Sequence, residues 1–414
     1  MFRGITRHKN FLLNRRFVHH LLKDDPIKHG ITSEEMDTLE KYANLRKSVN
    51  NIQEIRNLLE KLQFTKSKEL SDQLQKELRR LPNKTHPSVM HLQEPKVIET
   101  FNKFPEFSSN PEDFDEIAKK LNLIRTNHLG NFCGHKSYYF LGALAQLEHG
   151  LIRYALDIIR PKGFKLVTVP DILPPEVIQG CGMQTDGERN QVYKLENGLC
   201  LSGTSEMALA GFFKDKILEE EELPIKLTAT SRCFRAETSG THDEKGIYRV
   251  HQFTKVEMFS ICSENQSDEL LEEFKNTEIE LFKNIGIHFK LLDMPPNELG
   301  APAYRKYDIE SWMPGRNFWG EISSCSNCTD YQAQRLNIKY RTKSGEVKYV
   351  HSVNGTACAV PRLLISILET FQKAKGSVEI PEVLRKYMRG QEKIKRQKQL
   401  PELKLVKNIH SDLK

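Results

Sequence analysis

The chain has 414 residues, enough for one large domain or two, and 38% of them are hydrophobic, as in globular proteins. No apolar run approaches the ~18–20 residues that a membrane-spanning helix needs, so we expect no membrane partner. The formal net charge of +7 permits a nucleic-acid partner but does not require one.

The eight cysteines are scattered along the chain, unlike the disulfide framework of a small secreted protein. We therefore expect reduced thiols in an intracellular compartment. Cys325 and Cys328 form the one CxxC pair. Because a structural zinc site needs a second pair or suitably spaced histidines, we interpret this pair as a chance placement on a strand and turn.

The first residues, 1–23, are basic and contain no acid, with apolar side chains mixed among the arginines and lysines. This composition is typical of a mitochondrial transit peptide, and the apolar run is too short and broken for a secretory signal. The alternative is a disordered basic arm that contacts RNA. We interpret residues 1–30 as a transit peptide or disordered segment outside the fold.

Helical periodicity follows over residues 33–81, where apolar side chains recur at every third or fourth position from Leu39 to Leu62. A second helical run, residues 66–81, ends at Pro82. The pattern predicts an antiparallel helical hairpin over residues 31–82. Such a pair could reach out as an arm, or pack on the main domain or at a dimer contact.

Residues 82–135 have weak periodicity, and we interpret them as a linker with one short helix near 113–121. An amphipathic helix then runs from Leu144 to Ile158 and ends before Gly163. Phe164–Pro170 is predicted to be a strand.

A short hairpin, residues 191–202, is predicted across Glu196-Asn-Gly. It leads into the segment Gly203-Thr204-Ser205-Glu206 and an apolar helix. Thr204 is an expected N-cap of that helix, and the carboxylate of Glu206 is favourable in its first turn.

Residues 228–259 form two runs of alternating residues around a polar, glycine-containing connection, which predicts an antiparallel hairpin with a long loop. Residues two apart in a strand share a face. Arg235 and Glu237 therefore point the same way, and the return strand places five side chains on one face: Arg249, His251, Phe253, Lys255 and Glu257.

This face combines three kinds of recognition. Arginine holds polyphosphate by bidentate hydrogen bonds, a phenylalanine ring offers a surface on which a base stacks, and a carboxylate pairs with an ammonium group. A solvated outer face explains any one of these charges. The whole set, with Phe253 in its middle, favours a nucleoside triphosphate and an amino acid bound side by side.

The rest of the chain continues in hairpins and helices. An amphipathic helix is predicted over 266–285, and strands over Phe289–Leu292, Tyr307–Trp312, Gly320–Ser326 and residues on both sides of Lys343-Ser-Gly345. A last amphipathic helix bears Leu364, Ile367, Leu368 and Phe371. The order of elements favours a mainly antiparallel α+β domain over residues 83–390, followed by a basic tail, 391–414.

Two positions in this part raise questions. Glu321 and Ser324 are suitable hard ligands for magnesium, but they fall on opposite faces of a regular strand, so a bulge or the strand end must rotate one of them. Arg362 near a helix start opposes the macrodipole, which indicates an anionic partner. The alternatives are a solvated Glu321 and an arginine that covers a core helix.

The blocks FRAET and GIYRVHQFTKVEMF resemble motif 2 of the class II aminoacyl-tRNA synthetases, specifically the seryl-tRNA synthetases of the mitochondrial branch. The resemblance covers about His86 to Arg389. Residues 144–170 resemble motif 1, which forms the dimer in this class. The segment around Arg362 resembles motif 3, with Ala357, Cys358 and Pro361 in place of the more common glycines.

The resemblance implies a serine–tRNA ligase of the mitochondrial matrix that uses ATP and Mg²⁺, acts on serine and tRNA(Ser), and is a homodimer. It implies catalytic roles for Arg235, Arg249 and Arg362. ATP would be bound by these arginines with Glu237, Phe253, Glu321 and Ser324, the last two also holding magnesium. Serine would be bound by Thr204, Glu206, Arg235, Glu257, Asn354 and Thr356, and the helical arm would contact tRNA.

Three alternatives remain open. A non-catalytic paralogue could keep the fold as a mitochondrial RNA- or protein-binding factor, although such a protein is expected to have lost phosphate-binding arginines, and all three are present. A class II ligase for another amino acid is the second, but no glycine-rich or zinc-binding pocket is visible. A purely structural mitochondrial protein is the third.

Overall fold

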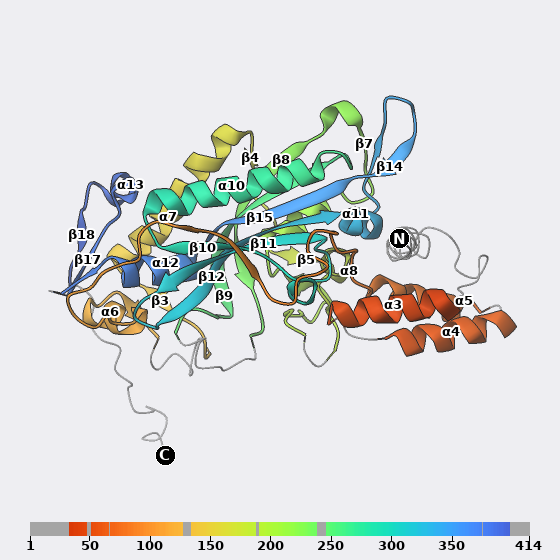
Figure 1. Ribbon diagram of the computed structural model, residues 1–414, viewed down its shortest axis with the longest axis horizontal. Helices are drawn as coiled ribbons and strands as arrows, with labels where there is room; N and C mark the ends of the chain where they lie inside the picture. The colour runs from red at the N-terminus through yellow and green to blue at the C-terminus, as the bar shows by residue number, and fades with distance from the viewer. Residues whose placement is uncertain are drawn as a thin grey trace, which may run out of the picture.

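The structure, a computed structural model, describes residues 33–47, 51–65, 67–126, 134–187, 190–237, 246–374 and 376–397. The predicted transit peptide, the tip of the long hairpin loop and most of the basic tail lie outside these residues. Figure 1 shows a large twisted sheet with helices packed along it and a separate group of helices at one end.

The central sheet has eight strands in the order β1-β10-β11-β12-β15-β9-β8-β4. Every neighbouring pair is antiparallel except β4 and β8, which run parallel. The predicted mainly antiparallel α+β fold is therefore confirmed. The strands are β1 (Lys96–Phe101), β10 (Phe289–Asp293), β11 (Arg305–Met313), β12 (Phe318–Thr329), β15 (His351–Ala359), β9 (Gln252–Cys262), β8 (Ile225–Phe234) and β4 (Lys165–Leu166).

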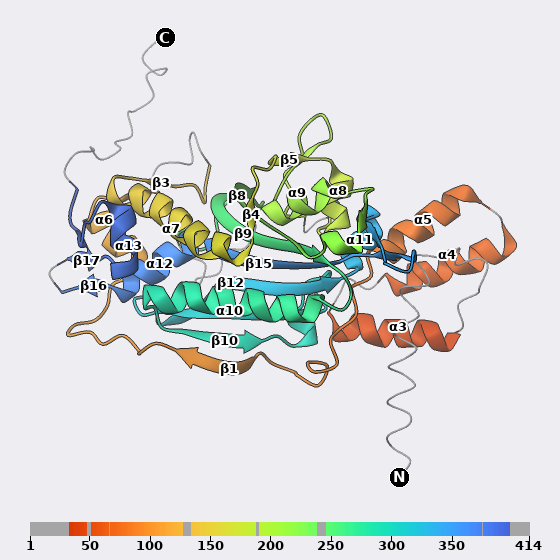
Figure 2. The same cartoon turned by 90° about the horizontal axis from the view of Figure 1, so that it is seen from above.

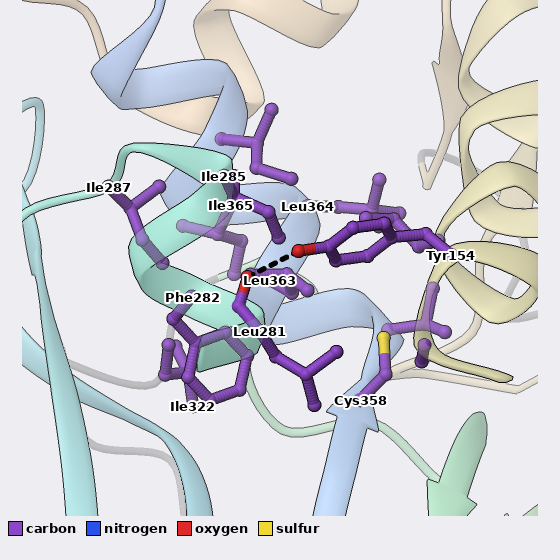
Figure 3. Packing of buried hydrophobic residues seen from close by; sticks show 14 of the residues in the cluster. Tyr154, Leu281, Phe282, Ile285, Ile287, Ile322, Cys358, Leu363, Leu364 and Ile365 are labelled. Atoms are coloured by element: carbon purple, nitrogen blue, oxygen red, sulfur yellow. Dashed lines mark hydrogen bonds between the residues drawn. The ribbon is translucent and has the colours of Figure 1, made fainter. Parts of the chain in front are cut away.

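Three helices cover one face of this sheet: α7 (Ala143–Ile159), α10 (Ser267–Ile285) and α12 (Val360–Thr370). Their apolar faces meet the alternate strand residues that point toward them, such as Val256, Ile309 and Ile322, in the main core. In Figure 3, the buried Tyr154 of α7 donates its hydroxyl hydrogen to the carbonyl oxygen of Leu281 at 2.8 Å and so ties α7 to α10.

The opposite face of the sheet is divided along its length. At one end Ala229, Phe259 and Ile261 pack into a second core with α8 (Pro175–Gly180), α9 (Ser205–Phe212) and α11 (Tyr331–Leu336). Further along β9 the same face carries Glu257, Lys255 and Phe253 in place of core residues. The polar side chains of the hairpin therefore lie where the second core ends.

The remaining elements are small and lie at the edges of the molecule. One group, with β16–β18 and α13, lies at the end opposite the N-terminal helices (Figures 1 and 2). All the small elements together are α6 (Phe114–Lys120), β2 (Ile124–Arg125), β3 (Tyr139–Phe140), β5 (Ile172–Leu173), β6 (Cys200–Leu201), β7 (Ile217–Glu219), β13 (Lys339–Arg341), β14 (Val347–Tyr349), β16 (Gln372–Lys373), β17 (Ser377–Glu379), α13 (Glu382–Arg385) and β18 (Lys393–Ile394).

Between residues 33 and 79 the described part of the chain forms three helices, α3 (Ser33–Leu45), α4 (Ile52–Phe64) and α5 (Lys68–Arg79), where the sequence predicted two. The first predicted helix is divided because the backbone at Lys47 is left-handed, with φ of 45°, which ends a helix. Neither glycine nor proline marks this break in the sequence. The three helices share a small apolar core of their own.

Two further elements differ from the prediction. The edge strand β1 lies within the segment predicted to be a linker. It was not predicted because all of its side chains except that of Phe101 are exposed and show no core pattern. The alternating residues Leu336, Ile338 and Tyr340 predict a strand before Lys343-Ser-Gly345, but Leu336 ends helix α11, which stops at Asn337 in the left-handed conformation, and the strand begins at Lys339.

In the described residues no helix is long and apolar enough to cross a membrane. The seven cysteines described are all buried and free, including Cys325 and Cys328 on β12.

Candidate active site

The β8–β9 hairpin forms the wall of a cavity that opens to solvent and measures about 580 Å³ when its open mouth is included. Its register sets Cys233 opposite Phe253, Ser231 opposite Lys255 and Ala229 opposite Glu257. Arg235 and Glu237 follow the end of β8, and Arg249 precedes the start of β9. The cavity is lined by Arg235, Glu237, Ile247, Tyr248, Arg249, Val250, Phe253, Lys255, Glu321, Ile322, Ser323, Ser324, Thr356, Ala359, Pro361 and Arg362.

All three predicted arginines face this cavity from different elements. The Arg235 guanidinium lies 5.3 Å from the centroid of the Phe253 ring, and its Nε donates to the Gly203 carbonyl oxygen at 3.3 Å. Nη1 of Arg249 lies 3.7 Å from Oε2 of the buried Glu237. The cavity is therefore cationic on the side that the hairpin ends form.

Arg362 reaches the cavity from the first turn of α12. Its Nη1 donates to the Glu321 carbonyl oxygen at 3.1 Å and lies 3.5 Å from Oε2 of the same residue. Its guanidinium also lies 4.6 Å from the centroid of the Tyr248 ring. The anionic partner expected from its unfavourable position near a helix start is thus Glu321.

A bulge in β12 brings Glu321 and Ser324 to one face. Ser323 pairs with Ile309, but Glu321 pairs with the next residue of β11, Glu310, so that Ile322 is the extra residue of the bulge. Ile322 is buried in the main core and also touches the cavity, and the pairing of Glu321 with Glu310 and of Ser324 with Asp308 sets both side chains on the cavity face. The difficulty in the sequence pattern is resolved by the bulge that it required.

A second group of polar side chains lies beside this cavity, toward the second core. Thr204, the N-cap of α9, accepts a hydrogen bond from the Glu206 amide at 3.3 Å, and its Oγ1 also donates to Oε2 of Glu257 at 3.2 Å. Oε1 of Glu206 accepts from Asn354 of β15 at 2.8 Å. Thr204 therefore caps the helix and also contacts the carboxylate of Glu257.

Both carboxyl groups in this second group have perturbed pKa values. Burial, together with the nearby Glu257, raises the pKa of Glu206 to about 7. Burial also raises the pKa of Glu257, although the ammonium group of Lys255 opposes that shift. Raised pKa values in a cleft are typical of functional sites.

The structure thus places the twelve predicted site residues in two adjoining groups. Arg235, Glu237, Arg249, Phe253, Glu321, Ser324, Thr356 and Arg362 line the cavity, whereas Thr204, Glu206, Glu257 and Asn354 lie behind its wall. His251 shares their sequence pattern but turns away, with its Nδ1 2.6 Å from the Tyr193 hydroxyl.

Among the site residues that were not predicted, three make charged, hydrogen-bonded or ring contacts with predicted ones. Lys255 forms an ion pair with Glu257, Tyr248 lies under Arg362, and Gln332 of α11 donates to Oε1 of Glu206 at 2.6 Å. The alternation of the return strand already set Lys255 on the binding face. Gln332 lies far away in the sequence and carried no signal.

Comparisons with known proteins identify the family of this chain. Residues 192–371 match the model of the tRNA synthetase class II core domain (G, H, P, S and T). The chain is 44% identical to the mitochondrial serine–tRNA ligase of Bos taurus over 84% of its own length and 68% of that protein's. It is 42% identical to the serine–tRNA ligase of Treponema denticola over 74% of its length and 75% of that protein's.

The chain belongs to the seryl-tRNA synthetases. Among solved structures, the seryl-tRNA synthetase of Pyrococcus horikoshii complexed with ATP superposes with a TM-score of 0.77 at 31% identity, covering 94% of this chain and 93% of that one. The cytoplasmic enzyme of Naegleria fowleri, in complex with AMP, gives a TM-score of 0.73 at 27% identity, covering 94% and 92%. Family membership therefore extends to the N-terminal helices as well as the sheet.

Proposed function

We propose that this chain activates serine with ATP to form seryl-adenylate and transfers the seryl group to mitochondrial tRNA(Ser) in the mitochondrial matrix. One observation carries the proposal: three arginines, an aromatic ring and two buried carboxyl groups surround one side of a single hairpin. The names of the relatives and the ATP and AMP complexes of the structural neighbours support it.

In the first step an oxygen of the serine carboxylate forms a bond to the α-phosphorus, and the bond from that phosphorus to the bridging oxygen breaks. Pyrophosphate leaves with the electron pair. The carboxylate is already ionised at neutral pH, so no general base is needed, and catalysis rests on positioning and on stabilisation of phosphate charge. In the second step a ribose hydroxyl of the tRNA attacks the seryl carbonyl carbon, and AMP leaves.

The arginines divide the work of holding the phosphates. Arg235, which lies nearest the serine side, would hold the α-phosphate and the serine carboxylate. Arg249 and Arg362 would hold the remaining phosphates. Phe253 and Arg362 would sandwich the adenine ring, and the buried carboxylate of Glu237 would accept hydrogen bonds from its amino group.

The bulged segment of β12 fits a magnesium ion that is bound together with ATP. Magnesium in phosphate sites takes one or two protein oxygens and completes its shell with phosphate and water. Glu321 and Ser324 supply one carboxylate and one hydroxyl on the same face, and the described residues contain no larger cluster of metal-binding side chains. The ion would neutralise charge on the phosphates.

Serine would occupy the space around the second group. Glu257 would accept the serine ammonium, and Thr204, Glu206, Asn354 and Thr356 would shape a small polar pocket for the hydroxyl. A site whose buried polar groups pair with a substrate hydroxyl rejects an analogue that lacks it by ~10⁴–10⁵. Alanine is therefore expected to be a very poor substrate.

The wider assembly belongs to the same proposal. The chain would form a homodimer through residues 144–170, which include α7 and β4. The short N-terminal helices would contact tRNA, residues 1–30 would direct import into the mitochondrion, and residues 83–390 would form the catalytic core.

The decisive experiment is serine-dependent exchange between ATP and pyrophosphate, with threonine and alanine as controls. We expect exchange with serine alone. No exchange with any amino acid would reject the proposal in favour of a non-catalytic paralogue, and exchange with another amino acid only would indicate a different ligase.

A further inference from the structure

Lys255 stands between the two groups of the site. It lines the cavity beside Arg235 and Thr356, whereas Glu257, two residues further along the same face of β9, does not line it. Nζ of Lys255 pairs with Oε2 of Glu257, and only 9% and 2% of the two side chains are exposed. The lysine therefore closes the path from the ATP cavity to the carboxylate assigned to serine.

The carboxylate of Glu257 needs a cation at all times. A buried carboxylate without a partner is strongly destabilised and takes up a proton instead. The ammonium of Lys255 and the hydroxyl of Thr204 both contact Oε2, and Arg235 adds positive charge nearby. In this structure the lysine supplies the charge that neutralises Glu257.

The substrate carries the same chemical group at the same place. Serine has a primary ammonium, as lysine does, and the proposed function directs that ammonium to Glu257. Both cations compete for one oxygen that Thr204 already shares. Serine must therefore displace Lys255 to form the same ion pair with Oε2.

We propose that Lys255 is an internal substitute for the serine ammonium, displaced when serine binds and thereby released to the phosphates of ATP. This inference rests on the proposed function. The displaced lysine remains in the cavity wall next to Arg235, where the serine carboxylate and the α-phosphate would meet. No charge is left unpaired, because one ammonium replaces the other at Glu257.

The mechanism predicts that serine and ATP bind cooperatively. Serine frees a cation for the triphosphate, so ATP is bound more tightly when serine is present, and by reciprocity serine is bound more tightly when ATP is present. A lysine that serves only as a fixed counter-ion would produce no such coupling.

The test measures binding of the non-reactive α,β-methylene-ATP, by calorimetry, with and without saturating serine. In the natural protein we expect serine to tighten this binding by about 5–150-fold. In Lys255→Met the factor by which serine tightens binding of the analogue should fall to nearly one. Serine itself should still bind, since its ammonium still pairs with Glu257. The exchange rate should fall more than the KM for serine changes.

Two further variants keep the test decisive if Lys255→Met is unstable. Lys255→Arg keeps the positive charge, but a guanidinium forms two parallel hydrogen bonds to a carboxylate. Serine should therefore displace the arginine less easily and bind at least ~10-fold more weakly. Lys226→Met removes a comparable ion pair, with Glu273 at 2.6 Å, outside the cavity lining and should leave the coupling intact.

The outcomes separate this inference from the function beneath it. If the natural protein binds neither serine nor the analogue, the proposed function fails. If it binds both cooperatively and Lys255→Met or Lys255→Arg behaves identically, the role of Lys255 is overturned and the function stands. Loss of coupling in Lys226→Met would also overturn it, since the effect would then be general.

Discussion

Two regions of this molecule hold arginine side chains in different ways. At the junction between the N-terminal helices and the main sheet, Arg46 is 3% exposed and donates to six oxygens, four of them backbone carbonyls of Asn83, Lys84, Gly300 and Ala303. In the cavity, Arg235 donates to one carbonyl at 3.3 Å and otherwise faces an aromatic ring and open space.

The difference separates an arginine that holds the fold from one that awaits a ligand. The guanidinium group has five N–H donors. Arg46 directs two of its nitrogens at fixed protein oxygens, which pins loops 83–85 and 300–303 to helix α3. Arg235 keeps its charge turned toward the cavity, where an anionic substrate would pair with it, whereas Arg249 and Arg362 face the cavity from beside Glu237 and Glu321.

The largest effect is expected for Arg235→Ala. Loss of a donor that stabilises charge in the transition state typically costs ~10²–10³ in rate, and Arg235 would serve both the α-phosphate and the serine carboxylate. Serine-dependent exchange should therefore fall by at least that factor, while thermal unfolding stays close to that of the natural protein. Full activity would remove Arg235 from the site.

Arg341→Ala is the matched control for that prediction. Arg341 is half exposed, pairs with Glu219 at 3.6 Å and lies outside the cavity lining. An exposed ion pair contributes ~0–1 kcal/mol. If this variant lost as much exchange activity as Arg235→Ala, the loss would reflect general damage to the protein and not the chemistry of the cavity.

In contrast to Arg235→Ala, Arg46→Met should lower the stability of the protein and leave the exchange activity nearly unchanged. The substitution removes the hydrogen bonds of a buried guanidinium: the Tyr42 hydroxyl and the Ala303 amide still donate to the carbonyl oxygens of Asn83 and Gly300, but the carbonyl oxygen of the buried Ala303 loses its Arg46 donor. Since a hydrogen bond to a charged group contributes ~1.5–3 kcal/mol, we expect a loss of roughly 3 kcal/mol in the free energy of unfolding. Denaturant titration measures this loss. Exchange per folded molecule should change little, and a selective loss of exchange would contradict the division between the two kinds of arginine.

Thr204→Val probes a residue that belongs to both categories. It removes a helix N-cap, worth about 1 kcal/mol, and the hydroxyl that donates to Glu257 at 3.2 Å. We expect a modest loss of stability and a rise of about tenfold in the KM for serine, from one lost hydrogen bond to a charged group. Thr204→Ser should restore both properties, and a Ser variant as impaired as Val would contradict the role of the hydroxyl.

How much of this site could be predicted depended on how far apart its residues lie in the sequence. The hairpin face followed from a strand period of two, so Arg235, Phe253 and Glu257 could be grouped from the sequence. A magnesium site at Glu321 and Ser324 called for either a bulge or a strand end between them, and the structure has a bulge, at Ile322.

Contacts over long sequence separations carried no such period. Gln332 reaches Glu206 over 126 positions, and Arg46 reaches Gly300 over 254. Each depends on how whole elements pack, which no local pattern contains. The edge strand β1 was missed for a different reason, because its exposed side chains lack the alternation that marks a half-buried strand.

The last effect is on stability and not on activity, and it concerns pH and the carboxyl group of Glu206. Burial and Glu257 raise its pKa from 4.5 to about 7 in the folded protein. Between these pH values the unfolded chain has released the proton and the folded protein still binds it, so stability falls as pH rises, by at most about 1.4 kcal/mol per pH unit. Above pH 7 this contribution becomes constant.

Glu206→Gln should remove that part of the pH dependence. The pKa values of Asp308 and Glu369 are also raised to about 7, by burial first of all, so the natural protein and the variant share the rest of the slope. The measurement is the difference between their free energies of unfolding from pH 5 to pH 8, which should shift in favour of the variant as pH rises. A difference that does not vary with pH would show that Glu206 is an ordinary ionised carboxylate. Its side chain, which accepts hydrogen bonds from Asn354 and Gln332, would then carry a full negative charge beside Glu257.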